Sequence, residues 1–186
     1  GGPAVAGRQV AETVESDLAR AELIAFPLVF LLSLWVFRGV VAAFLPPLVG
    51  LASIATTLLG LRAVVELTDL SVFAVNLVTG LGLGLAIDYS LFMVSRYREE
   101  LAVGGHTVET LQRTLATAGR TVLFSSLTVA AAMSSLFVFP QRFLFSMALG
   151  GTLVALASGA IALVALPALL HLLGPRVNAL APARWR

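Results

Sequence analysis

The sequence contains no cysteine and no lysine, and only 12% of its 186 residues are charged. Without cysteine the segment has no disulfide, thiolate metal ligand or thiol nucleophile. A soluble domain carries roughly 25% charged residues, so this chain has too little polar surface for that class. Its formal net charge is +2 and its twelve arginines are scattered. The charge pattern therefore gives no sign of nucleic-acid binding.

Long uncharged runs take the place of the missing charges. Hydrophobic residues make up 59% of the sequence, and the mean hydropathy is +0.98. A helix that crosses a membrane needs about 20 mostly apolar residues. Asp, Glu, Lys and Arg are absent from residues 23–37, 39–61, 70–87, 121–141 and 143–175. We predict an all-α integral membrane protein with five transmembrane helices, the first of which is short.

The boundaries follow from these runs and from the residues between them. The predicted spans cover residues 22–37, 40–65, 70–95, 120–139 and 143–173. Pro46 and Pro47 should kink the second span or delay its start. Thr107 can cap a short helix on the membrane surface inside a cytoplasmic loop, 96–119. We interpret 1–21 as the end of an external domain with an amphipathic lead-in helix, and 174–186 as a cytoplasmic linker.

Arginine asymmetry orients the spans. With the N-terminus outside, one side of the membrane receives eight arginines and the other receives four, and the richer side should be cytoplasmic. No signal peptide or membrane span precedes the first predicted helix. We therefore expect an earlier helix and an external domain before Gly1, in a multi-pass protein of the cell membrane.

Asp88 is the acidic residue that lies well inside a predicted span. Placing a charge near the centre of a membrane helix costs roughly 2.5–3.5 kcal/mol on insertion scales, and such residues are usually functional. Asn76, Gly80, Gly84 and Asp88 follow one another at intervals of four, so they form one small, polar stripe on the helix. A partner helix or a file of water could lie along it.

A carboxyl group at this position can accept a proton from one side of the membrane and release it to the other. Tyr89 can hydrogen-bond this carboxyl group or its partner on another helix. The alternative is structural: Asp88 would be a hydrogen-bonding strut between helices, and Tyr89 a packing residue.

The residues around Asp88 resemble the fourth-helix signature of the MMPL transporters, within the resistance-nodulation-division superfamily. The signature reads GLGLGLAIDYSLFMVSRYREEL at 80–101. Further matches are DLARAELIAFPL at 17–28, RTLATAGRTVLFSSLTVAAAM at 113–133, FPQ at 139–141 and LGPRVNAL at 173–180. The resemblance covers nearly the whole chain and is specific.

The resemblance implies a larger protein. Members of the family have twelve membrane helices in two similar halves, each with an external domain after its first helix, and this chain resembles helices two to six of the first half. The implied function is proton-driven export of lipids or other hydrophobic molecules. The implied partners are that cargo, the second transmembrane half, the external domains and membrane lipids.

The resemblance also implies roles for particular residues. Asp88 and Tyr89 would form a proton relay with an equivalent pair on helix ten. Gly84 would allow a close helix approach beside Asp88, supported by the stripe residues Gly80 and Asn76. Ser125 and Ser126, on the next span, would line the relay.

Other functional classes fit the sequence less well. An intramembrane aspartyl protease needs two carboxyl groups that share a proton, and the spans supply one. We therefore expect a secondary active transporter with no catalytic residues. A scaffold subunit, or a sterol-sensing or protein-export relative, remains the alternative. His106 and His171 have no partner at metal-ligand spacing, so no metal or cofactor is expected.

Overall fold

The computed structural model describes residue 20 and residues 23–25, 27–65 and 72–179. Over these ranges the chain is helical and contains no strand. Most of the predicted lead-in helix, residues 66–71 and the end of the predicted linker lie outside the described residues. The all-α prediction is confirmed for the part of the chain that is described.

Four helical segments are long and apolar enough to cross a membrane: Val40–Ala63, Ala74–Gly104, Val108–Val138 and Arg142–Asn178. A shorter apolar helix, Leu23–Phe37, precedes them and is called the first helix here. Each predicted span is therefore mostly helical where the structure describes it. The first helix differs from the other four in falling short of the length for an independent span.

The second span begins where its apolar residues begin. Helix α2 (Val40–Val65) contains both Pro46 and Pro47, so its start is not delayed, contrary to one of the two predicted outcomes. The turn before it is tight because Arg38 adopts a positive φ of 51°. Buried hydroxyls inside α2 bond to carbonyls one turn earlier, as Ser53 does to Val49 O at 2.8 Å. That bond keeps a polar side chain satisfied in apolar surroundings.

The third helix continues well past the predicted end at residue 95. Helix α3 (Val72–Gly104) carries its charged turns, which include Arg96 and Glu100, beyond the apolar section. Arg96 bonds Glu99 at 2.9 Å and Glu100 at 2.5 Å, so these charges pair along the helix itself. Pairs spaced three or four residues apart support a helix, which explains the extension.

The fourth span is one long element built from several kinds of helix. Thr107 caps α4 (Val108–Thr114) by accepting a bond from Thr110 N, as predicted. A π-helical turn η1 (Leu115–Gly119) then leads into α5 (Arg120–Ser134), and a 3-10 turn η2 (Ser135–Val138) ends it. The predicted surface helix is thus continuous with the membrane span.

The last span contains a break. Helix α6 (Arg142–Leu163) gives way at Val164 to α7 (Ala165–Leu173), because Pro167 has no N–H with which to bond Leu163 O. Gly174 ends α7 with a positive φ of 49°, and its α-carbon faces the His106 ring closely. A final 3-10 turn, η3 (Gly174–Asn178), follows.

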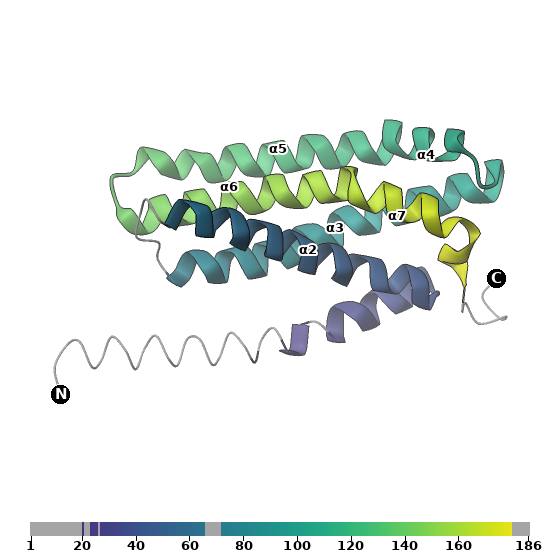
Figure 1. Cartoon of the computed structure of the whole chain (residues 1–186), viewed down its shortest axis with the longest axis horizontal. Helices are drawn as coiled ribbons and strands as arrows, with labels where there is room; N and C mark the ends of the chain where they lie inside the picture. The colour runs from purple at the N-terminus through teal and green to yellow at the C-terminus, as the bar shows by residue number, and fades with distance from the viewer. Residues whose placement is uncertain (1–19, 21–22, 26, 66–71, 180–186) are drawn as a thin grey trace.

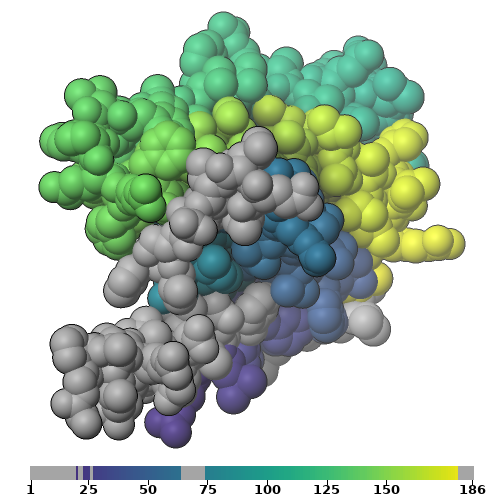
Figure 2. Space-filling model, turned by 60° about the vertical axis from the view of Figure 1, so that its left-hand side comes forward, coloured from purple at the N-terminus to yellow at the C-terminus, as the bar shows by residue number. Residues whose placement is uncertain are grey.

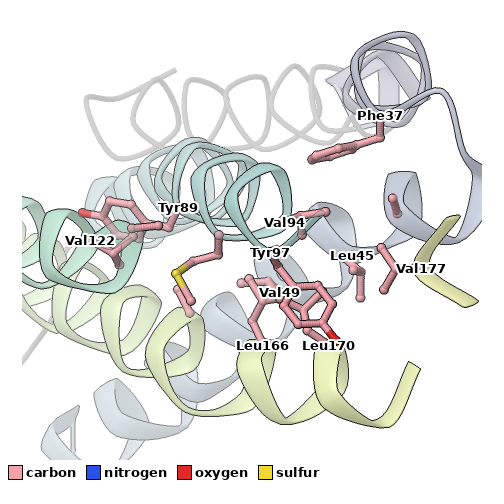
Figure 3. Packing of buried hydrophobic residues seen from close by; sticks show 14 of the residues in the cluster. Phe37, Leu45, Val49, Tyr89, Val94, Tyr97, Val122, Leu166, Leu170 and Val177 are labelled. Atoms are coloured by element: carbon pink, nitrogen blue, oxygen red, sulfur yellow. The ribbon is translucent and has the colours of Figure 1, made fainter. Parts of the chain in front are cut away.

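Helices α2, α3 and α6 pack against one another, and α6 also packs against α5 (Figure 1). In the space-filling view the α5–α6 layer, in green, lies above α2, in blue (Figure 2). The large apolar core joins the end of the first helix, α2, α3 and α7, where Phe37, Tyr97 and Leu170 are buried (Figure 3). This core lies at the arginine-rich end of the bundle and holds α3 in place.

Small residues allow the close packing of the helices. A Cβ added at Gly159 of α6 would lie 2.5 Å from Ser126 Oγ of α5. A Cβ at Gly82 of α3 would lie 2.8 Å from Val154 of α6. Helices in a membrane gain stability from such close van der Waals contact, so these positions explain how α6 contacts both neighbours.

Candidate functional site

The polar stripe on α3 faces outward from the bundle. Gly80, Gly84 and Asp88 are exposed, and Asn76 is half-buried at the far end of the stripe. A Cβ added at Gly80 or Gly84 would meet no atom within 4 Å. The spacing of four brings these residues onto one face, and among the described residues no helix covers that face.

Tyr89 lies on a different face from its neighbour Asp88, because successive helix residues are turned by about 100°. Its side chain is only 3% exposed and belongs to the main core. It points towards α5 beside Val122 (Figure 3). The sequence-predicted pair is therefore split, with the carboxyl group on the open face and the phenol in the packed interface.

The Tyr89 hydroxyl is an unpaired polar group. It lies beside Ser125 of α5, but the pair misses hydrogen-bonding geometry, and Tyr89 Oη has no partner among the described residues. A buried hydroxyl without a partner costs roughly 1–3 kcal/mol in proteins. Such a group calls for an explanation, and a partner outside the described residues would supply one.

The two serines predicted to line the relay face different ways. Ser125 is exposed and adjacent to Tyr89. Ser126 is 3% exposed, donates to Leu123 O at 3.0 Å, and packs against Gly159 of α6. The structure therefore brings Ser125 to the Tyr89 side of the site, while Ser126 serves the α5–α6 contact.

A groove of about 570 Å³ begins about one turn beyond Asp88, at Leu91 and Phe92, and extends towards the arginine-rich end. Phe92, one turn beyond Asp88 on the same face of α3, lines the end of the groove that is nearer to Asp88. Thr117 and Thr121 line its other wall, and Arg96 donates to Thr117 Oγ1 at 3.2 Å. Hydroxyl groups and charges thus follow one another along a groove between the open face and the end of the bundle.

The charged motif after Asp88 forms contacts that its sequence only partly indicates. Arg96 forms ion pairs with Glu99 and Glu100 along the helix. Arg98 has a further role, because it donates to Phe37 O at 2.5 Å and to Asn178 Oδ1 at 2.7 Å. These bonds join the end of the first helix to η3, and no local pattern could have indicated partners so far away in sequence.

The two histidines, which have no partner at metal-ligand spacing in the sequence, lie close together in the fold. The rings of His106 and His171 lie 5.2 Å apart, and His106 Nδ1 lies 3.3 Å from Tyr97 Oη. His171 lies on α7, which packs beside the loop after α3 that carries His106, and this packing brings the two rings together. Groups of three or more His, Asp or Glu that could hold a metal are absent from the described residues.

Comparison with known proteins identifies the family of this chain. The MMPL family model matches residues 1–186. A Streptomyces coelicolor chain named as a membrane protein is 48% identical over 186 residues, which is 100% of this chain and 26% of that protein. The trehalose monomycolate exporter MmpL3 of Mycolicibacterium smegmatis is 44% identical over 168 residues, covering 90% of this chain and 17% of that protein.

A more distant relative is the mycolic acid-containing lipids exporter MmpL11 of Mycolicibacterium smegmatis. It is 32% identical over 173 residues, covering 93% of this chain and 18% of that protein. The chain thus spans between 17% and 26% of the length of these relatives. The family match over the whole chain, together with four helices long enough to cross a bilayer, places this chain in a membrane as a member of the MMPL family.

Proposed function

We propose that this segment carries one half of a proton relay in a transporter that exports lipids or other hydrophobic molecules across the cell membrane. The observation that carries the proposal is Asp88, an acidic side chain on the open face of a helix long enough to cross the membrane. An uncompensated carboxylate there would cost roughly 2.5–3.5 kcal/mol, so it needs a protonation state or a partner that changes during function.

The relay would be completed by a part of the protein that lies on the stripe. Gly80 and Gly84 leave open space beside Asp88, which is the condition for a second helix to approach closely. The unpaired Tyr89 hydroxyl supports the same reading, because a polar partner is missing from the described residues. Relatives named as lipid exporters are several times longer than this chain, which leaves room for that partner.

The groove lined by Thr117 and Thr121 supplies the proton path to the cytoplasm in this proposal. Hydroxyl groups both donate and accept hydrogen bonds, so they can order a file of water between Asp88 and the charged end of α3. Each proton that moves down a membrane potential releases about 2.3 kcal/mol per 100 mV. Protonation and release at Asp88 would couple that energy to movement of the cargo, which makes the protein a secondary active transporter.

The test is lipid export by the complete protein carrying Asp88→Asn. Asparagine keeps the size and polarity of the side chain but cannot lose a proton, so export should fall to background while folding and membrane insertion are unchanged. Glu109→Gln is the control, because this exposed carboxylate lies on α4, away from the stripe, and should leave export unaffected.

Export at the wild-type rate by Asp88→Asn would contradict the relay and favour a structural role for Asp88. Loss of export together with loss of the folded protein would be resolved by Asp88→Glu, which keeps an ionisable carboxyl group. The relay predicts that Glu restores part of the export that Asn abolishes, whereas a purely steric role predicts equal loss.

A further inference from the structure

A second hollow lies at the arginine-rich end of the bundle, away from Asp88. It has a volume of about 850 Å³ and is bounded by the end of the first helix, by α3 and by η3, which meet at one end of the molecule (Figure 1). Its polar lining comes from Ser95, Arg98, Glu99, Arg176 and Asn178. A smaller hollow of about 410 Å³ adjoins it through Arg98 and is lined by Trp35 and Arg38.

The polar lining consists mostly of hydrogen-bond donors. Arg98 uses Nε and Nη1 for Asn178 and Phe37, and its Nη2 makes no hydrogen bond to any described residue. Asn178 accepts through Oδ1, so its amide nitrogen remains a donor. Glu99 is the acidic member, and its charge is compensated by Arg96 at 2.9 Å. The hollow is therefore suited to an anion with several acceptor oxygens.

An apolar strip leads from this hollow along the first helix. Leu28, Leu31, Leu32, Trp35 and Val36 are exposed by 56%, 60%, 53%, 73% and 44%. Their spacing places them on one face of the helix. Val36 belongs to both the strip and the lining of the hollow. Trp35 lies where the apolar strip meets the arginines. Tryptophan is enriched at the membrane–water interface, so this position fits the boundary between acyl chains and headgroups.

We propose that this hollow binds an anionic phospholipid of the cytoplasmic leaflet, separate from any exported cargo. Its phosphate lies against Arg98 and Arg176, and its acyl chains lie along the strip from Leu28 to Val36. Charge complementarity selects an anionic headgroup, because basic pockets between membrane helices on the cytoplasmic side attract such lipids. The apolar strip favours a lipid over a soluble phosphate. A free phosphate has no acyl chain, so it would leave the strip without a bound ligand.

The experiment titrates the complete protein in detergent with phosphatidylglycerol or phosphatidylcholine and counts bound lipids by native mass spectrometry. Arg176→Gln should weaken phosphatidylglycerol binding by roughly five-fold, as expected for one arginine near an anionic headgroup. Arg120→Gln is the matched control, because Arg120 is exposed at the same end of the bundle on α5, outside the hollow. It should bind as the wild type does.

Further arms separate the proposal from its rivals. Phosphatidylcholine binding should be the same in all variants. Asp88→Asn should retain phosphatidylglycerol, so a failure of the proton relay leaves this result unaffected. Arg98→Gln combined with Arg176→Gln should weaken binding further, with thermal unfolding measured alongside because Arg98 also joins two segments.

Three outcomes would overturn the proposal. Arg176→Gln could bind phosphatidylglycerol as tightly as Arg120→Gln does, in which case the hollow takes no part. Phosphatidylcholine could show the same dependence on Arg176, in which case charge does not select the lipid. Excess inorganic phosphate could displace the lipid from the wild type, in which case the site recognises a free anion.

Discussion

At the scale of single residues, Asp88 and Tyr89 are neighbours in sequence that lie on different faces of α3. The rotation of the helix places the carboxyl group on the open face and the phenol in the core. Asp88 could be singled out from sequence, because a charged residue inside an apolar run is costly to place in a membrane and is therefore usually functional. The unpaired state of Tyr89 Oη was not predictable, because it depends on where α5 packs.

Tyr89→Phe tests the unpaired hydroxyl. In the complete protein the relay gives this hydroxyl a polar partner outside the described residues, so its removal should lower the free energy of unfolding by about 1 kcal/mol. Export should fall as well, because the hydroxyl serves the relay. Tyr97→Phe is the matched change, and it should lower stability by about 1 kcal/mol because Tyr97 Oη contacts His106. Reversible unfolding and export are measured on the same preparations; a wild-type export rate in Tyr89→Phe would remove Tyr89 from the relay.

At the scale of helices, the apolar runs predict where elements lie, while their packing depends on particular small residues. The end of α3 was misplaced because a charged section was read as loop, although its charges pair along the helix. Glycines look alike in sequence, yet Gly159 is pressed against α5 and Gly84 faces open space. Only the arrangement of helices distinguishes a packing glycine from one on a free face.

Gly159→Ala should lower the free energy of unfolding of the protein by about 1–3 kcal/mol, because the added methyl group meets Ser126 in a packed interface. Gly60→Ala on α2 is the control, since nothing lies within 4 Å of its added Cβ. Alanine also favours a helix over glycine by about 1 kcal/mol, so this control should be neutral or stabilising. Equal stabilities for the two variants would show that α5 and α6 do not pack as described.

At the scale of the whole molecule, the arginine-rich end of the bundle fixes the expected orientation. The absence of cysteine from this sequence allows single cysteines to report it. We choose Val138→Cys and Val103→Cys. Val138 ends η2 and is 83% exposed, and Val103 lies near the end of α3 and is 85% exposed. With any cysteine elsewhere in the protein replaced, a membrane-impermeant maleimide added to intact cells should label the first and not the second. The reverse pattern would invert the topology.

Sequence reasoning reached the fold class, the helices and Asp88, because these depend on hydropathy and local spacing. It did not reach the His106–His171 contact or the bonds from Arg98 to Phe37 and Asn178, because those pairs meet only through the tertiary fold. The hollow at the arginine-rich end depends on the same long-range contacts. Candidate site residues on one helix could thus be predicted from sequence, whereas contacts built from several helices could not.

The central claim is that a proton passes through Asp88 during transport, and proton flux measures this most directly. The complete protein is sealed into liposomes that contain lipids of its host and a pH-sensitive dye, and a pH gradient is imposed. The wild type should dissipate the gradient when cargo lipid is present, and Asp88→Asn should dissipate it no faster than empty liposomes. Dissipation by Asp88→Asn at the wild-type rate would contradict the account.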